Sequence, residues 1–192
     1  MIKRCMVIAL TVAAVVCSVA AADEVGGSVY DRWPSSLGYA VNSEGGAGLS
    51  WQRWFGLTGV AVTAGGLYNE DGVDSPTLYG YDYAALDYNA QLRISRRLHT
   101  AEYSSWLSSN LQAVGLIAHR GYLPYEYVGY DETTYESLYA RLPYVGEYML
   151  GAGVAIEMTY YGHFSQTFDF MYVAKWPLEL AIAFGTSFRY RY

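Results

Sequence analysis

The sequence predicts an all-β chain that folds as a transmembrane, up-and-down, antiparallel β-barrel, with eight strands as the expected count. Two observations carry this prediction. Apolar and polar residues alternate with a period of two in several long stretches, including one of fifteen residues at the C-terminus. The apolar set is also rich in aromatic residues, with 21 tyrosines in 192 residues. Membrane barrels use such amphipathic rings at both interfaces of the bilayer.

The stretch Leu178–Tyr192 shows the alternation most clearly. One face carries large side chains: Leu178, Leu180, Ile182, Phe184, Thr186, Phe188, Tyr190 and Tyr192. The other face carries small, polar or charged ones: Glu179, Ala181, Ala183, Gly185, Ser187, Arg189 and Arg191. Lipid outside and a polar lumen inside would suit these two faces. The segment resembles the C-terminal assembly strand of outer-membrane barrels, which implies that Phe188, Tyr190 and Tyr192 are recognised by the barrel-assembly machinery.

The N-terminus is typical of a cleaved secretory signal peptide over residues 1–22. Lys3 and Arg4 precede the apolar run Met6–Val16, and the small residues Ala20–Ala22 follow it. Lipidation of Cys17 is the alternative, which the bulky Val16 before it disfavours. We therefore expect residues 23–34 to form a lead-in and residues 35–192 to form the barrel.

Composition excludes several function classes. Both cysteines, Cys5 and Cys17, lie in the signal peptide, so the mature chain has neither disulfides nor thiol chemistry. Of 12 basic residues, 10 remain once Lys3 and Arg4 are removed, against 18 acidic ones, a net charge of −8. An acidic chain argues against a nucleic acid as partner.

The alternation repeats along the chain. It predicts strands around residues 47–54, 59–68, 83–98, 107–117, 147–160, 167–175 and 178–192. An odd number of strands is unusual for a bacterial single-chain barrel, so Ser36–Val41 is expected to supply the first of eight.

Loop lengths predict the orientation, because such barrels have short periplasmic turns and longer surface loops. The turns near Leu57, Thr100 and His163 are short and are expected in the periplasm. The segments Asn69–Asp82 and Tyr122–Tyr144 are long and are expected outside. The link at 175–177 is then a very short surface loop.

From strand pattern, strand count and terminal aromatic residue together, the chain resembles small eight-stranded outer-membrane proteins of the OmpX and OmpW kind. The resemblance covers most of residues 35–192. It implies location in the bacterial outer membrane with lipid as a partner, and it implies architecture more specifically than activity.

The sequence offers no convincing active site, and we expect no enzyme activity, no cofactor and no metal. His99, His119 and His163 are scattered, without the spacing of a zinc site. A rim enzyme built from His119, Asp131 and Ser137 is the alternative, but a loop rich in Ser and Asp would offer that combination by coincidence. The Gly-Gly pairs at 45–46 and 65–66 lack the lysine and helix of a phosphate loop.

The segment 122–144 is the most distinctive exposed stretch. It interleaves acidic residues with tyrosines, among them Tyr125, Tyr127, Tyr130, Tyr135 and Tyr139. Tyrosine is enriched in binding surfaces, which favours a contact surface for an extracellular ligand. The alternative is that several of these tyrosines belong to the interface girdle.

Charged residues on the inward faces predict the state of the lumen. We expect Glu157 and Asp169 to accept hydrogen bonds from Arg93 and Arg189 and to plug the barrel, because buried charges need partners. We expect Asp87, Glu147 and Glu179, with only Lys175 to balance them, to form an acidic mouth. The predicted function is structural or surface interaction through 122–144. The alternative is a narrow OmpW-like channel for small solutes, hydrophobic ones included, in which the charges form a selectivity ring.

Overall fold

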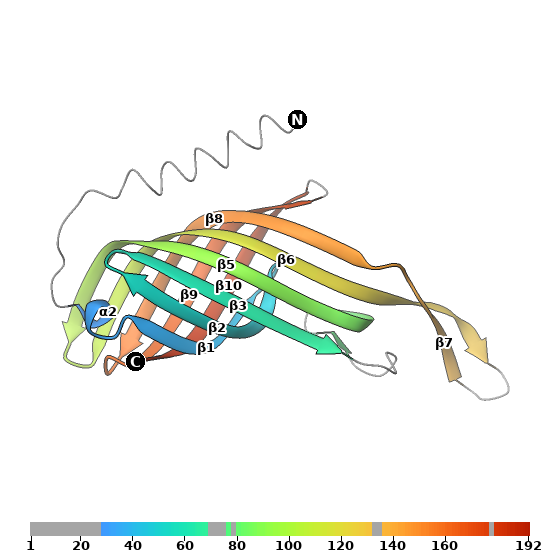
Figure 1. Cartoon of the computed structure of the whole chain (residues 1–192), viewed down its shortest axis with the longest axis horizontal. Helices are drawn as coiled ribbons and strands as arrows, with labels where there is room; N and C mark the ends of the chain where they lie inside the picture. Colours follow the sequence, from blue (N-terminus) through green and yellow to red (C-terminus); the bar gives the residue numbers. More distant parts are fainter. Residues whose placement is uncertain (1–27, 69–75, 78–79, 132–135, 177–178) are drawn as a thin grey trace.

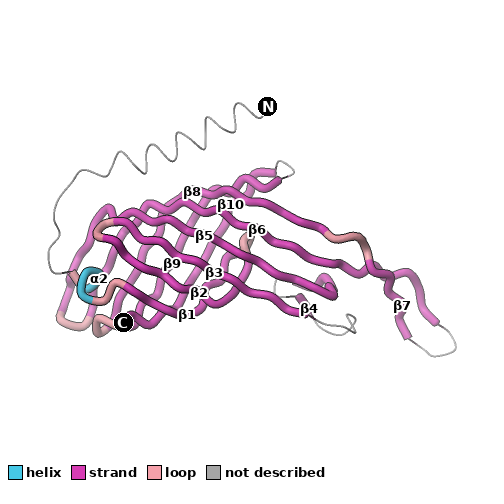
Figure 2. Tube along the Cα trace, viewed as in Figure 1, coloured by secondary structure: helices cyan, strands magenta, loops and turns pink. Residues whose placement is uncertain are grey.

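The computed structural model describes residues 28–68, 76–77, 80–131, 136–176 and 179–192. In this part of the chain one antiparallel sheet closes into a barrel (Figures 1 and 2). Its eight strands are β1 (Ser35–Asn42), β2 (Gly46–Phe55), β3 (Thr58–Tyr68), β5 (Gly80–Ser104), β6 (Leu107–Asp131), β8 (Val145–Tyr160), β9 (Phe164–Trp176) and β10 (Glu179–Arg191). Each pairs with its neighbours in chain order, and β10 closes the ring against β1. The expected eight-stranded, up-and-down barrel is confirmed, with its first strand over Ser36–Val41.

Three short elements lie outside the ring: α2 (Val29–Arg32), β4 (Pro76–Thr77) and β7 (Glu136–Arg141). β7 pairs with the last part of β6, from Tyr125 to Asp131. This β6–β7 hairpin projects well beyond the rest of the barrel (Figure 1). The segment 122–144, expected as a loop, is therefore largely a two-stranded ribbon. Its many tyrosines favour extended backbone as well as contact surfaces.

The barrel has two different ends. We call the end with α2, Tyr192 and the turns at 56–57, 105–106 and 161–163 the base, and the end from which the β6–β7 hairpin projects the mouth (Figure 1). The turn expected near Thr100 lies at 105–106, because β5 continues to Ser104. Gly56 and Gly162 take left-handed φ values of 56° and 75° that tight turns require and that glycine adopts without strain.

The outer wall of the barrel is apolar and the inner wall largely polar, the reverse of a soluble sheet protein. Large exposed side chains cover the outside of every ring strand, among them Leu37, Leu49, Val62, Leu92, Ile117, Leu150, Phe168 and Phe184. Buried polar side chains line the inside, among them Ser50, Gln52, Asn89, Gln91, Asn110 and Gln112. No helix in the described ranges is long and apolar enough to cross a membrane. The predicted signal peptide lies outside the described residues.

Candidate functional site

Ion pairs fill the half of the lumen nearer the base. We call this half the lower lumen and the half nearer the mouth the upper lumen. Arg93 Nη1 on β5 lies 2.6 Å from Asp169 Oδ2 on β9. Arg191 on β10 pairs with Glu157 on β8, and both side chains are fully buried. Gln112 on β6 joins the two pairs, because its Nε2 donates to Glu157 Oε2 at 2.8 Å while its Oε1 accepts from Arg93 Nη2 at 3.4 Å. The network thus connects five strands across the lumen.

The structure places Arg93, Glu157, Asp169 and Arg189 on the inner wall, but it pairs them differently from the sequence-based expectation. The predicted contact of Arg93 with Asp169 is present. The prediction that Arg189 also donates to one of the two carboxylates is wrong, because Arg191 pairs with Glu157 and Arg189 donates to Ser50 and Thr167 instead. Arg191 is covered by the ring of Tyr30, whose centroid lies 4.5 Å from its Cζ. A guanidinium so shielded from water needs the nearest available carboxylate.

Residues 28–34, expected only as a lead-in, close the base. Tyr30 of α2 is fully buried, and its ring packs edge-on against Trp54 with the centroids 5.8 Å apart. Arg97 of β5 lies over both rings, 5.2 Å from the centroid of Tyr30 and 5.3 Å from that of Trp54. Thr159 Oγ1 donates to the Tyr30 hydroxyl at 3.3 Å. Burial raises the pKa of Tyr30, so this hydroxyl stays neutral.

Arg97 also holds the helix by charge. Its Nη2 lies 2.9 Å from Asp31 Oδ1, and its Nη1 donates to Ser28 Oγ at 2.8 Å. Ser28 Oγ in turn donates to Asp31 Oδ2 at 2.8 Å. Partial burial opposes ionisation of Asp31, but the hydrogen bonds from Ser28 and Arg97 outweigh it, and the pKa of Asp31 is lowered from 3.8. We call residues 28–34 the base plug. Sequence reasoning missed it because no periodicity marks so short a segment.

The upper lumen contains an apolar cluster that the expected polar interior does not include. Its members come from β6, β8, β9 and β10: Val114, Leu116, Ala118, Met149, Ala155, Met171, Val173 and Ala183. They occupy inward positions of the same strands whose outward positions are also apolar. The alternation in these stretches is therefore one of large against smaller side chains as much as of apolar against polar ones.

The turn between β1 and β2 bends over the opposite side of the mouth. Gln91 Nε2 donates to the carbonyl of Gly45 at 2.9 Å, and Asn89 Nδ2 donates to that of Ala47 at 2.8 Å. Asn42 Oδ1 accepts from the backbone N–H groups of Glu44 and Gly45 at 3.0 and 2.9 Å. An ion pair between Glu44 and Lys175 of β9 holds the turn across the opening. We call residues 43–45 the mouth turn.

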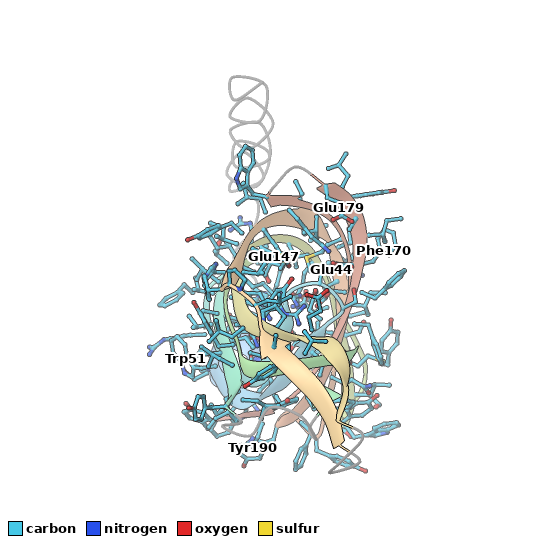
Figure 3. The ribbon with its side chains drawn as sticks, turned by 90° about the vertical axis from the view of Figure 1, so that its right-hand side faces the viewer. Glu44, Trp51, Glu147, Phe170, Glu179 and Tyr190 are labelled. Atoms are coloured by element: carbon cyan, nitrogen blue, oxygen red, sulfur yellow. The ribbon has the colours of Figure 1, made fainter. Side chains whose placement is uncertain are left out.

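The mouth is acidic but better balanced than expected. Figure 3 looks into it and shows Glu44, Glu147 and Glu179 around the opening, while Trp51 and Phe170 point away from the barrel. Besides Lys175, Arg120 supplies positive charge, because its Nη2 lies 3.3 Å from Asp87 Oδ2. The expectation that Lys175 is the only balancing charge is wrong. Tyr122 donates to Glu147 Oε1 at 3.4 Å.

A hydrogen-bonded cluster of His119, Tyr88 and Tyr144 lies on the outside of the barrel near the mouth. His119 Nδ1 donates to the carbonyl of Glu147 at 3.0 Å, and His119 Nε2 lies 3.2 Å from the hydroxyl of Tyr88 and 3.3 Å from that of Tyr144. The two hydroxyls are 2.8 Å apart, and the ring of Tyr148 stacks on His119 with centroids 4.4 Å apart. A side chain at Gly121 would overlap Tyr88 and Tyr144. These residues form an aromatic collar where β8 leaves the hairpin.

The structure does not assemble a catalytic site from the residues considered for a rim enzyme. His119 belongs to the collar, whereas Asp131 and Ser137 lie toward the far end of the hairpin, where β6 pairs with β7. His163 packs at the base between Trp33 and Tyr190, with ring centroids 4.8 and 5.4 Å away. Across the described residues, no group of three His, Cys, Asp or Glu side chains is arranged to hold a metal ion.

The remaining predicted site residues fall into two groups. Phe188, Tyr190 and Tyr192 point outward at the base and are about half exposed. Of the hairpin tyrosines, Tyr125, Tyr127 and Tyr130 lie on β6 and Tyr139 on β7, where it pairs with Tyr127. Tyr135 falls outside the described residues.

Comparisons with known proteins show similarity at the level of solved structures. No protein-family model matches the chain, and no curated protein matches it. It is similar to the crystal structure of Ail, the attachment invasion locus protein of Yersinia pestis, at 12% identity with a TM-score of 0.36, covering 83% of this chain and 97% of that one. The crystal structure of Ail in complex with the heparin analogue sucrose octasulfate matches with a TM-score of 0.39 at the same identity and coverage.

Proposed function

We propose that the chain is an integral protein of the bacterial outer membrane, a closed barrel that anchors the β6–β7 hairpin at the cell surface as a contact surface. The observation that carries this proposal is the combination of an apolar outer wall with a lumen that is packed and covered at both ends. A soluble barrel would not expose such a wall, and an open pore would not contain such a packed lumen.

The outer wall supports insertion in a membrane. Side chains such as Leu49, Leu180 and Phe184 are 61–80% exposed, and they recur on every ring strand. Transferring apolar surface from water to lipid gains about 25 cal/mol per Å². A patch of this extent on a monomer marks contact with a membrane or a partner, and a belt around a complete barrel fits lipid.

The lumen supports an anchor rather than a channel. Eight strands leave an interior just wide enough for side chains. Here the base plug, the ion pairs around Gln112, the apolar cluster and the mouth turn succeed one another along the barrel axis. The charges thus act as packing, and no contact in the described residues favours the alternative of a selectivity ring.

The C-terminal strand supports delivery to the outer membrane by the barrel-assembly machinery. β10 carries Phe188 and Tyr190 on its outer face, is followed directly by the half-exposed Tyr192, and pairs with β1 to close the ring. Closure joins the two ends of the barrel segment, so β10 is available for recognition until this last pairing forms.

The hairpin supports surface contact. β5 and β6 are 25 residues long, whereas β1 has 8 and β10 has 13, and the excess of β6 forms the hairpin beyond the mouth. Its tyrosines offer large contact areas at low entropic cost. Strands that served only to complete the barrel would not need to extend beyond their neighbours.

Two measurements test this proposal. The purified protein should give no discrete conductance in planar bilayers, and discrete channels would refute the closed lumen. A trimmed variant, in which a short turn replaces residues 126–140, should still fold and insert. Bacteria carrying the trimmed chain should attach less to other cells than bacteria carrying the full chain. Equal attachment would refute the contact role and leave only an anchor.

A further inference from the structure

Arg189 stands out among the buried charges of the lower lumen. Five charged side chains gather there: Arg93, Glu157, Asp169, Arg189 and Arg191. Two pairs account for four of them, Arg93 with Asp169 and Arg191 with Glu157. Arg189 is 5% exposed, and no carboxylate in the described ranges lies within 4.0 Å of it. The group therefore carries one excess positive charge.

The contacts of Arg189 are weak substitutes for an anion. Its Nε and Nη2 both donate to Ser50 Oγ, at 3.3 and 3.1 Å, and its Nη1 donates to Thr167 Oγ1 at 3.4 Å. A guanidinium has five N–H groups, and here three of them share two neutral oxygens. Charge-assisted hydrogen bonds are normally shorter, at about 2.7–2.9 Å.

Hydroxyl groups without partners lie at inward positions within two residues of Arg189 in the sheet register. Ser165 lies directly opposite it on β9, and Ser187 precedes it by two residues on the same face of β10. Ser36 on β1 pairs with Arg191, one step closer to the base. All three are at least 97% buried, and their Oγ atoms have no hydrogen-bond partner in the described part of the chain. Each is an O–H donor that needs an acceptor.

From these observations we propose that the inner wall around Arg189 binds a small monovalent inorganic anion, of halide size, as a built-in part of the folded barrel. One negative charge neutralises the excess of the five-residue group. The same ion accepts hydrogen bonds from the free N–H groups of Arg189 and from the orphaned hydroxyls of Ser165 and Ser187, the two of these serines that lie on β9 and β10 beside it. Water would satisfy the hydroxyls but would leave the buried charge uncompensated, which is costly in a closed lumen. The narrow lumen excludes larger anions.

The test uses the mature chain refolded into detergent micelles with either sodium bromide or sodium gluconate at equal ionic strength. Because gluconate is too large for the site, only bromide should stabilise the barrel. We expect the unfolding temperature to rise by about 3–6 °C for each tenfold increase in bromide above its dissociation constant. In crystals grown with bromide, an anomalous-scattering peak should lie in contact with the guanidinium of Arg189.

Arg189→Gln should remove the dependence on bromide, while the exposed Arg32→Gln, which makes the same change of charge at the base, should keep it. The proposal is overturned if the wild-type barrel is equally stable in both salts, if bromide stabilises Arg189→Gln as well, or if the crystals show no bromide beside Arg189. Should Arg189→Gln fail to assemble, the salt dependence of the wild type and the bromide peak decide the question without it.

Discussion

At the scale of single residues, the lower lumen depends on pairing rather than on polarity alone. Glu157 is fully buried and accepts from Arg191 and from Gln112. Removing one partner of such a pair leaves the other charge buried without compensation, whereas replacing both with apolar groups can be nearly neutral.

We therefore predict that Glu157→Gln lowers the free energy of unfolding by about 3–5 kcal/mol, measured by denaturant titration in micelles, without creating conductance in planar bilayers. The double variant Glu157→Leu with Arg191→Met should recover much of the loss, because neither charge of this pair is left buried without the other. Glu102→Gln, an exposed glutamate at the end of β5, is the control and should change little. Unchanged stability with new conductance would make the pair a gate.

The sequence predicted the positions of the inner-wall charges but only part of their pairing. The alternation placed Arg93, Glu157, Asp169 and Arg189 on the inner wall, because a strand's side chains point to opposite faces in turn. It did not identify which of these charges meet, because long arginine side chains reach several rows of the sheet. Glu157 pairs with Arg191 rather than with Arg189, and Arg191 is the one covered by Tyr30, which comes from a segment without any strand pattern.

At the scale of elements, α2 is a helix of one turn that tertiary contacts alone hold in place, since isolated helices this short are not stable. Its charged contact is Asp31 with Arg97, 2.9 Å apart. Because the pKa of Asp31 is lower in the folded protein than its ordinary value of 3.8, its contribution is complete above that value. It is lost as the pH falls through the lower folded value.

We predict that a cysteine introduced at the half-buried Val29, in a chain of residues 23–192 that has no other cysteine, reacts faster with a thiol probe as the pH falls below about 3.8, the ordinary pKa of aspartate. Reactivity is read with a pyridyl disulfide, which reacts with thiols in acid, added during the acid exposure itself. In Asp31→Asn the site should already label at neutral pH, with little further change in acid. Equal protection of both proteins at all pH values would show that Tyr30 alone holds the plug.

The outer faces of the strands allow a matched comparison between membrane and water. Phe184 on β10 and Val128 on the hairpin part of β6 are almost equally exposed, at 61% and 59%. Arginine at Phe184 should cost about 2–4 kcal/mol if that position lies near the bilayer midplane. Arginine at Val128 should cost less than about 0.5 kcal/mol, because an exposed position in water tolerates charge. Folding into lipid vesicles measures both, and equal costs would contradict the division between barrel and hairpin.

At the scale of the whole molecule, strand number and order followed from the sequence because seven ring strands alternate visibly and the even strand count of bacterial barrels requires an eighth. The hairpin and the apolar cluster did not follow. A tyrosine-rich stretch is equally typical of a loop and of a ribbon. The alternation puts Met149 and Leu116 on the inner wall, but the expectation of a polar lumen gave no reason to predict an apolar cluster there. The base plug and the apolar filling of the upper lumen were therefore not predicted by the alternation of apolar and polar residues.

Orientation in the membrane is the property on which the proposed function depends, and it is testable on intact bacteria. The C-terminus, α2 and the short turns share the base, and the hairpin leaves from the mouth (Figure 1). An epitope tag inserted near Asp131 should therefore bind antibody on intact cells. A tag near His163, in the turn between β8 and β9, should bind only after the outer membrane is permeabilised. Because both sites lie between strands, neither insertion interrupts a ring pairing, and heat-dependent gel mobility confirms folding of each variant. Labelling of the His163 tag on intact cells, with the Asp131 tag hidden, would place the hairpin in the periplasm and end its proposed role as a surface contact.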